Sequence, residues 1–449
     1  MRQPTWSQGR VWQPCRVRGS KARYGVAVTV VLLAALGLRL GYMDLTPGYA
    51  IVHDARDYDT HARSIAIGEG FSKRLTGKPT AFRPPGYPYL LGGAYRVFGV
   101  ERGVDADRIR VARTLGAVLG VLGVALIGML GVQLLGRTTG LVTMGLAALY
   151  VPAILVSEAL MSEQLFVVLM LGALVAAIHQ GRSAHPYAFA LLAGLLAGLA
   201  VLTRANGLIL LVPLVIAVWA APRRSWRSAG PPALLVAVAL ATVAPWTIRN
   251  AVELHAFVPV STQLGWALAG TYNDEARNDH VNPGSWRSLR RVPEYKPLVA
   301  NFPTVPEIVM ERRLSRAGRE FIDRHPGYLA TVAYWNTRRL LDLASLRWSR
   351  HTASTISVDP GWADAGVVGF WIFAALALVG ATHRAARRVP WFVWLLPLAM
   401  YLSVIFLAAE TPRYRAPLDP FIVLLAAIAV TQLVGSRDSQ LNRGDHARN

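Results

Sequence analysis

The amino-acid sequence predicts an all-α polytopic membrane protein with about ten transmembrane helices and two large extracytoplasmic loops. Of its 449 residues, 53% are hydrophobic and only 16% are charged, and the mean hydropathy is +0.35. The apolar residues come in blocks, such as 111–135 and 391–409, many of which are about as long as the roughly 20 residues that cross a bilayer. A soluble chain of this size would bury its apolar residues in one or two cores between charged surfaces.

The chain begins with a basic tail, residues 1–24, which precedes a first apolar run at 24–43. Lys and Arg concentrate on the cytoplasmic side of membrane helices, so we expect this tail to be cytoplasmic. No convincing small-residue cleavage site follows Leu40, which favours a retained anchor over a signal peptide. Cys15 is the only cysteine, so the chain has no disulfide framework and no thiol-rich metal site.

The remaining transmembrane segments are expected at 111–135, 138–156, 163–179, 187–202, 206–221, 231–246, 365–382, 391–408 and 417–435. This arrangement places four short loops inside: 136–140, 180–186, 222–227 and 383–388. All four are basic, as the orientation rule requires. Both termini are then cytoplasmic, and the last segment leads into a cytoplasmic tail at 436–449.

Two long loops, 44–110 and 247–364, fall outside the membrane. They divide the chain into an N-terminal membrane module at 25–246, which includes the first loop, the outer loop 247–364, and the C-terminal helices at 365–435. Within the second loop, residues 306–343 are expected to form two helices broken at Pro326-Gly327. These helices suit either the outer membrane interface or a small extramembrane cap.

Charged residues occur at the short outer junctions, where the orientation rule does not favour arginine. Each could merely reach the lipid head groups, but together they converge on the outer side and indicate a cavity lined by arginines and carboxylates. The charges at the short outer junctions are Glu158, Glu163, Arg204, Glu410, Arg413 and Arg415. On the same side, Arg39 lies near the outer end of the first segment, and Arg249 lies where the segment 231–246 leaves the membrane.

The first outer loop adds clustered acid to the same side. Asp54 and Asp57 are three residues apart and would share one face of a helix, whereas Asp59 would point elsewhere as a solvated turn residue. Further along, FRPPGYPYL (82–90) is expected to hold the backbone extended and return it to the membrane. The alternative is that this rigid stretch also forms a fixed wall that presents Arg83 or Tyr87 to a substrate.

This set of residues suits a lipid-linked donor with a phosphate leaving group. Arginine forks bind phosphate oxygens, and a carboxylate opposite them can take the proton of an acceptor hydroxyl. No Gly-rich phosphate loop is present, and the acids face away from the cytoplasm, so nucleotide sugars are poor candidates. The net charge of +21 orients the helices or attracts anionic lipids; with no separate basic domain, nucleic acid is not an expected partner. We expect no cofactor and no metal, although His53, Asp54 and Asp57 could hold a divalent cation.

Several stretches, in this order and topology, resemble the family 39 type of membrane glycosyltransferase, which has the GT-C fold. This group includes protein O-mannosyltransferases and the aminoarabinose transferases that modify lipid A. The stretches are HDARDYDTHARSIAIGEGF in the first loop, FRPPGYPYLLGGAYRVFG, SEALMSEQLF (157–166), LTRANGL (202–208), APWTIRN (244–250) and ETPRYRAPLDPF (410–421). The resemblance implies an integral cell-membrane enzyme with an extracytoplasmic active site that uses a polyprenyl-phosphate sugar and inverts the anomeric carbon.

The resemblance also implies roles for particular residues. The catalytic base falls on Asp54. Many relatives carry an Asp-Glu pair where this chain has Asp54-Ala55, and Asp57 is the nearest substitute for the second carboxylate. Arg413 or Arg415 most closely matches the arginine that binds the donor phosphate. The secondary phosphate-binding candidates are Arg204 and Arg249, and the further cavity candidates are Arg39, Arg83, Glu158 and Glu410.

Two other classes of protein are also compatible with these features. A transporter or flippase of a lipid-linked or anionic substrate would also gather charges in a membrane cavity. A polysaccharide ligase or polymerase would share the donor class. The sequence identifies neither the sugar nor the hydroxyl acceptor, which could belong to a protein, a lipid or a glycan.

Overall fold

The computed structural model describes residues 21–72, 77–220, 229–300, 304–407 and 411–446, with side chains to Leu433. Within these ranges the chain is almost entirely helical, with one isolated β-bridge between Ser72 and Pro79. The helices that form the bundle are α1 (Lys21–Leu45), α4 (Asp105–Leu135), α5 (Arg137–Leu149), α6 (Val151–Glu158), α7 (Glu163–Gln180), α8 (Pro186–Thr203), η1 (Ala205–Leu210), α9 (Leu211–Trp219), α10 (Gly230–Leu254), α17 (Pro360–Thr382), α18 (Trp391–Ile405) and α19 (Asp419–His446).

Further helices lie in the two long loops. The first loop contains α2 (His53–Ala66) and α3 (Gly86–Phe98). The second contains α11 (Leu264–Thr271), α12 (Asp274–Asn278), α13 (Lys296–Val299), α14 (Glu307–Arg324), α15 (Tyr328–Leu340) and α16 (Leu346–Ser354). Two short 3₁₀ helices, η3 (Ala386–Arg388) and η4 (Pro412–Arg415), flank α18.

Among the described residues, six helices are long and apolar enough to span a membrane: α1, α4, α7, α8, α10 and α17. The pair α5 and α6 makes a seventh if it is counted as one span bent by 59°. Three shorter apolar stretches, 205–219, 391–405 and 419–433, lie in the same bundle. The chain is therefore a multi-pass membrane protein, while the predicted total of about ten crossings stays a prediction.

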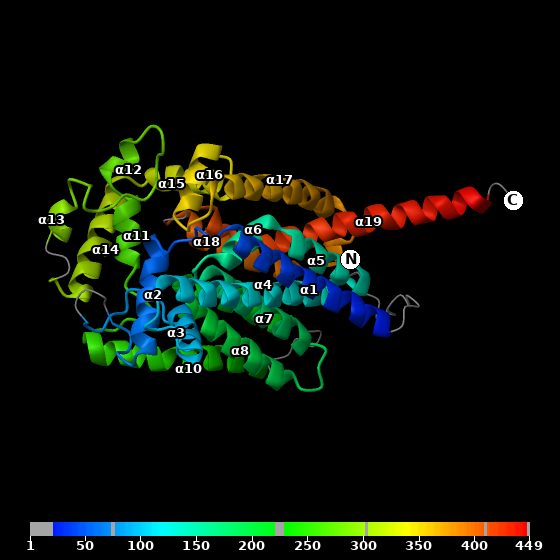
Figure 1. The fold of residues 1–449 in the computed structure, drawn as a ribbon, viewed down its shortest axis with the longest axis horizontal. Helices are drawn as coiled ribbons and strands as arrows, with labels where there is room; N and C mark the ends of the chain where they lie inside the picture. The colour runs from blue at the N-terminus through cyan, green and yellow to red at the C-terminus, as the bar shows by residue number, and fades with distance from the viewer. Residues whose placement is uncertain (1–20, 73–76, 221–228, 301–303, 408–410, 447–449) are drawn as a thin grey trace, which may run out of the picture.

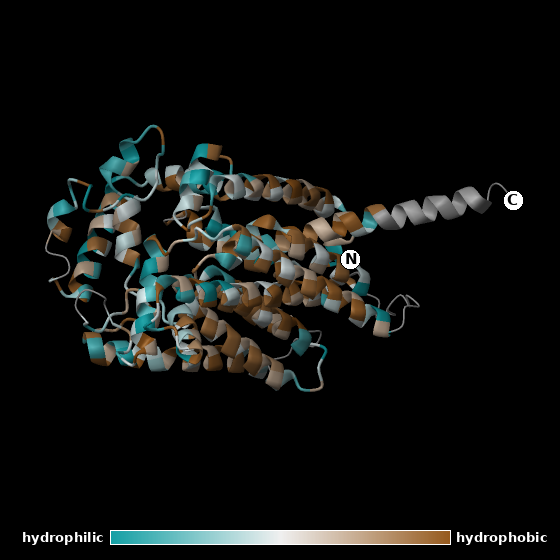
Figure 2. Ribbon diagram, viewed as in Figure 1, coloured by the Kyte–Doolittle hydropathy of each residue, from teal (hydrophilic) through white to brown (hydrophobic). Residues whose placement is uncertain are grey.

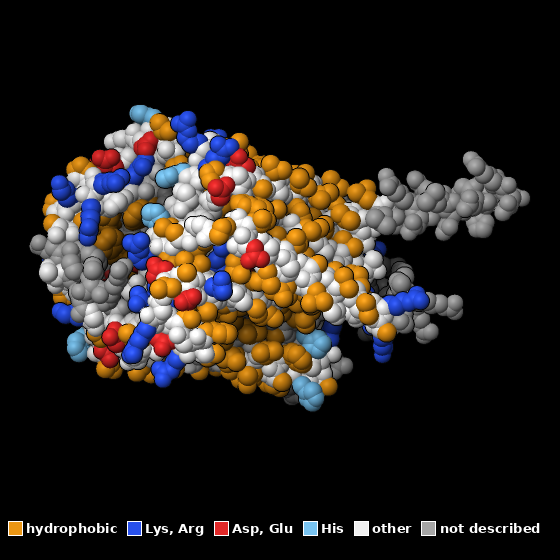
Figure 3. Space-filling model, in the orientation of Figure 1, with side chains coloured by type: hydrophobic (Ala, Val, Ile, Leu, Met, Phe, Trp, Pro, Cys, Tyr) orange, Lys and Arg blue, Asp and Glu red, His pale blue; other side chains and the backbone are white. Residues whose placement is uncertain are grey.

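Polar and apolar surfaces separate along the long axis of the molecule. Figure 1 shows the first turn of α1 and the last turns of α19 at one end of the bundle, and α2, α3 and α11–α16 toward the other. Hydrophobic residues predominate in the bundle helices, whereas the loop helices are more polar (Figure 2). Lys, Arg, Asp and Glu side chains gather at the loop end of the visible face, and apolar side chains cover most of the bundle flank (Figure 3).

Small residues allow the helices to approach closely near the loop end. A Cβ at Gly116 of α4 would lie 1.9 Å from the carbonyl oxygen of Ser157 in α6. A Cβ at Gly92 of α3 would lie 2.7 Å from the carbonyl oxygen of Ala62 in α2. Real Cβ atoms do not come this close, so only glycine fits at these crossings. These contacts hold the end of α6 next to the membrane helix α4, and α2 next to α3.

The structure confirms the break at Pro326-Gly327, because α14 ends at Arg324 and α15 begins at Tyr328. Leu314 and Phe321, on the apolar face of α14, are fully buried. A Cβ at Gly318, on the same face, would lie 2.8 Å from the Cβ of Leu268 in α11. This face of α14 therefore packs against protein, which favours an extramembrane cap over an interfacial helix.

Three expectations differ from the structure. Asp59 is not a solvated turn residue: it is buried in α2, accepts a hydrogen bond from Tyr95 at 2.9 Å, and pairs with Arg108 at 3.0 Å. A buried carboxylate needs such partners, and both come from residues distant in the sequence. The extended stretch 82–90 ends early, because α3 starts at Gly86 and includes Pro88 in its first turn, where proline loses no helical hydrogen bond. Finally, α10 and α19 continue past residues 246 and 435, to Leu254 and His446.

Candidate active site

Two carboxylates of α2 meet one guanidinium. Asp54 and Asp57 lie in the first turns of α2, where carboxylates suit the positive end of the helix dipole. Arg83 Nη2 donates to Asp54 Oδ1 and to Asp57 Oδ2, both at 2.7 Å, and Arg83 Nε donates to Asp57 Oδ2 at 3.2 Å. The two aspartates thus share one helix face, as predicted, and Arg83 lies against that face.

A second guanidinium reaches Asp54 from the far end of the chain. Arg413, in η4, donates from Nη2 to Asp54 Oδ2 at 2.5 Å across a sequence separation of 359 residues. Its Nε lies 3.7 Å from Glu163 Oε1 and donates to Thr411 Oγ1 at 3.2 Å. Asp54 is therefore held between two arginines, Arg83 from its own outer loop and Arg413 from the C-terminal part of the chain.

A third arginine, Arg204 at the end of α8, pairs with Glu163, the first residue of α7. Its Nη1 lies 2.8 Å from Glu163 Oε1 and donates to Ser162 Oγ at 3.2 Å. The ring of Tyr414 lies 5.2 Å from the guanidinium of Arg204 and 5.1 Å from that of Arg413, within the range of a cation–π contact. Glu163 thus connects Arg204 and Arg413, and Tyr414 packs beside both.

These six charged side chains form what we call the acidic–basic cluster: Asp54, Asp57, Glu163, Arg83, Arg204 and Arg413. Its three carboxylates balance its three guanidinium groups. The side chains of Asp54 and Asp57 are 33% and 46% exposed, whereas those of Arg83 and Arg413 are 11% and 10% exposed. The cluster therefore turns the carboxylates of Asp54 and Asp57 toward open space, whereas the Glu163 side chain is only 2% exposed and lies among the arginines.

The charges within the cluster control the ionisation of Asp54. Burial raises the pKa of the Asp54 carboxyl, but the positive charges of Arg83 and Arg413 and their hydrogen bonds outweigh burial and hold this pKa well below its usual value. Burial lowers the pKa of the Arg413 guanidinium, and Tyr414, Asp54 and Glu163 more than reverse this effect. Asp54 is thus an ionised carboxylate, and two arginines restrain its basicity.

Arg415 and Arg249 do not contact the acidic–basic cluster in the described structure. Arg415 lies 2.8 Å from Asp342 and 2.9 Å from Asp419, and its guanidinium packs 3.6 Å from the centre of the Phe370 ring. Arg249, near the end of α10, donates to the backbone carbonyls of Phe71 and Thr80 at 2.9 and 2.7 Å. Both side chains therefore connect elements of the scaffold.

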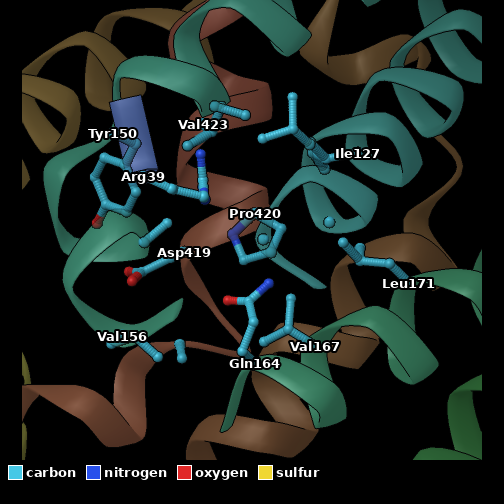
Figure 4. A pocket seen from close by; sticks show the side chains of 16 residues that line it. Arg39, Ile127, Tyr150, Val156, Gln164, Val167, Leu171, Asp419, Pro420 and Val423 are labelled. Carbon is cyan, nitrogen blue, oxygen red and sulfur yellow. The ribbon is translucent and has the colours of Figure 1, made fainter. Parts of the chain in front are cut away.

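Arg39 and Glu158 belong to a separate buried group. Glu158 Oε2 lies 3.4 Å from Arg113 Nε, and both side chains are almost fully buried. Arg39 of α1 donates to the carbonyl of Ala35 at 3.1 Å. It points into a cavity between α4, α6, α7 and α19 whose lining is mainly apolar, with Tyr150, Gln164 and Asp419 as its other polar side chains (Figure 4). Glu410 lies outside the described residues.

The sequence indicates Glu163 only as a charge at an outer junction and not as a candidate site residue. Its position in SEALMSEQLF, at the point where an apolar segment begins, is the signal that could have singled it out. A carboxylate at the outer end of a membrane helix is costly unless a cation accompanies it.

Within the part of the chain that the structure describes, no group of three or more His, Cys, Asp or Glu side chains could hold a metal ion. A metal-free site stays a prediction.

Comparisons with known proteins bear on the identity of this fold. Residues 82–248, less than half of the chain, match the family described as Dolichyl-phosphate-mannose-protein mannosyltransferase. No curated protein sequence matches the chain.

The structure is similar to the oligosaccharyltransferase of Archaeoglobus fulgidus over 96% of this chain. One such structure is AglB in complex with an inhibitory peptide and a dolichol-phosphate, with a TM-score of 0.53 and 15% sequence identity. Another is the enzyme in the apo form, with a TM-score of 0.54 and 14% identity. ArnT from Cupriavidus metallidurans bound to undecaprenyl phosphate gives a TM-score of 0.42 at 15% identity, over 94% of this chain and 80% of ArnT.

The chain spans about half the length of the oligosaccharyltransferases it matches, 52% in both structures. The similarity confirms the predicted GT-C glycosyltransferase fold. Together with the family match, it confirms the predicted resemblance to membrane glycosyltransferases of the mannosyltransferase type.

Proposed function

We propose that this chain, a multi-pass membrane protein with the GT-C fold, is a glycosyltransferase that uses a polyprenyl-phosphate sugar. It transfers the sugar to a hydroxyl acceptor with inversion at the anomeric carbon. The observation that supports this most strongly is the pairing of Asp54 with Arg413 at 2.5 Å. This contact places a carboxylate that can accept a proton beside a guanidinium that can bind a leaving phosphate.

The reaction follows from the two sides of the cluster. The acceptor oxygen attacks the anomeric carbon while its proton passes to a carboxylate oxygen of Asp54. The bond between the anomeric carbon and the phosphate oxygen breaks, and the electron pair stays on the leaving polyprenyl phosphate. Arg413, with Arg204 beside it, stabilises the charge that develops on this phosphate. Attack from the side opposite the leaving group inverts the anomeric carbon.

Donor binding itself would strengthen the base. Without a donor, Arg83 and Arg413 both bind Asp54 and keep its pKa low. A donor phosphate would draw Arg413 toward its own oxygens, so Asp54 would lose one of its two positive partners. Its proton affinity would then rise when the leaving group is in place. Asp57 would hold Arg83 and so keep α2 in position.

The polar end of the bundle that carries the cluster is proposed to face the extracytoplasmic side, with both termini cytoplasmic. The basic short loops support this orientation. Both described ends of the chain also lie at the opposite end of the bundle from the loop helices (Figure 1). The polyprenyl chain of the donor would lie among the membrane lipids while its phosphate meets the cluster at the surface.

The test is a transfer assay on purified protein in lipid with a panel of polyprenyl-phosphate sugars. The measured quantity is the release of free polyprenyl phosphate. We expect release from one donor class with wild type and none with Asp54→Asn. Asp44→Asn serves as the matched control, because Asp44 is an exposed aspartate in the same stretch of chain. Release by Asp54→Asn at the wild-type rate would exclude Asp54 as the base. No release from any donor by folded wild type would favour the transporter or flippase instead, which a flux assay would then test.

A further inference from the structure

One carboxylate of the second outer loop holds the segment that leads into Arg83. Glu307, the first residue of α14, accepts hydrogen bonds from Thr80 Oγ1 at 2.6 Å, from the Ala81 amide at 3.0 Å and from Thr262 Oγ1 at 2.7 Å. Thr80, Ala81 and Thr262 are all buried. One carboxylate of the second outer loop thus accepts from two buried groups of the first outer loop and from Thr262 of its own loop, which ties the two loops together.

The hydrogen bonds around Glu307 fix the backbone immediately before Arg83. Thr80 Oγ1 also accepts from the Phe82 amide at 3.0 Å, and the Ala81 carbonyl accepts from the Thr262 amide at 3.0 Å. The Thr80 carbonyl accepts from Arg249 at 2.7 Å. Residues 80–82 are therefore held by Glu307 and Thr262 of the second outer loop and by Arg249 of α10. Arg83 is the next residue along the chain.

We propose that Glu307 is a positioning residue, which sets the geometry of Arg83 against Asp54 and Asp57. The inference rests on the proposed function and deepens it, because it gives the second outer loop a part in arranging the site. The contacts that the structure describes for Glu307 go to residues 80–81 and Thr262 and not to the acidic–basic cluster, so it acts through residues 80–82 and the guanidinium that follows them. Its removal frees Arg83 to leave Asp54 while the membrane helices stay in place.

The same helix offers a matched control. Glu311 lies one turn after Glu307, and its carboxylate accepts from the Gly265 amide at 2.9 Å and from Ser315 Oγ at 2.8 Å. These contacts fasten α14 to α11 but do not involve residues 80–82. Loss of Glu311 tests the integrity of the cap, whereas loss of Glu307 tests the path to Arg83.

The first experiment is a double-mutant cycle in the polyprenyl-phosphate release assay. We expect Glu307→Ala to lower kcat by about tenfold in the wild-type background, but by less than about twofold in the Arg83→Gln background. The effects of two substitutions do not add when one residue acts through the other. Glu307→Asp and Glu307→Gln, which keep an acceptor, should recover part of the rate, and Glu311→Ala should change kcat by less than about twofold. Equal losses from Glu307→Ala in both backgrounds, or an equal loss from Glu311→Ala, would overturn the proposal.

The second experiment needs no activity and so separates this inference from the proposed function. Amide hydrogen exchange of the full-length protein in lipid reports local opening of residues 77–85. We expect about tenfold faster exchange in this segment for Glu307→Ala, and an unchanged rate for Glu311→Ala, whose effect should fall on 264–268. Unchanged exchange at 77–85 in Glu307→Ala would refute the positioning role whether or not the wild-type protein transfers sugar.

Discussion

Arg413 and Arg415 are two residues apart and similar in sequence context, yet the structure gives them different neighbours. Replacing each in turn by Gln therefore gives a sharp test. Arg413 faces the partly exposed carboxylate of Asp54, whereas Arg415 lies between Asp342 and Asp419 with only 3% of its side chain exposed. We expect Arg413→Gln to affect catalysis and Arg415→Gln to affect folding.

The expected magnitudes follow from these surroundings. Arg413→Gln removes a fixed positive charge from the proposed leaving-group position, and such losses lower kcat by about 10² to 10³-fold. Its effect on the free energy of unfolding should be about 1 kcal/mol or less, because water can reach Asp54, which is 33% exposed. Arg415→Gln leaves two carboxylates that are 3% and 7% exposed without their shared cation, which should cost about 3–5 kcal/mol.

Two measurements on each variant separate the outcomes: thermal unfolding in detergent, and polyprenyl-phosphate release in lipid. The expected pattern is a near-native melting temperature with little turnover for Arg413→Gln, and a lowered melting temperature for Arg415→Gln. Arg413→Lys keeps the charge without the planar fork and should lie between wild type and Arg413→Gln in kcat. The reverse pattern, a stable inactive Arg415→Gln beside an active Arg413→Gln, would refute this reasoning and assign the phosphate to Arg415.

Three further predictions concern the rest of the cluster and its support. Glu163→Gln should raise KM for the donor and lower kcat by about tenfold or more, because Arg413 and Arg204 lose the carboxylate between them; steady-state release kinetics check this. Arg249→Gln should lower the melting temperature by a few degrees, with a smaller loss of kcat than Arg413→Gln, since Arg249 donates to two backbone carbonyls and to Asn250 Oδ1 near the site rather than to the acidic–basic cluster. In the folded protein the pKa of Asp54 lies below its value in the unfolded chain. Its ionised form therefore stabilises the fold above about pH 4, and this contribution is lost as the pH falls below that value. The melting temperature of Asp54→Asn should therefore fall less steeply than that of wild type between about pH 5 and pH 3; equal slopes would argue against the two arginine contacts.

The helical membrane architecture could be predicted from sequence because its signal is local. The predicted apolar segments 111–135 and 365–382 are continuous in the chain, and the bilayer requires each to satisfy its backbone as a helix; they lie within α4 and α17. The break between α14 and α15 is similarly local, since proline cannot continue a helix without loss. The sharing of one face by Asp54 and Asp57 follows from helical spacing alone.

The partners of these charges depend on the tertiary structure. Asp54 meets Arg413 across 359 residues, and no local pattern encodes such a contact. Arg413 and Arg415 lie in the 3₁₀ helix η4, where positions two apart point in different directions, so one reaches the cluster and the other the scaffold. Asp59 is buried because Arg108 and Tyr95 approach it from other helices. Composition and periodicity thus determine which segments are helical membrane elements, but the pairing of charges depends on how those helices pack, because burying a charge requires a partner that only the folded chain brings near.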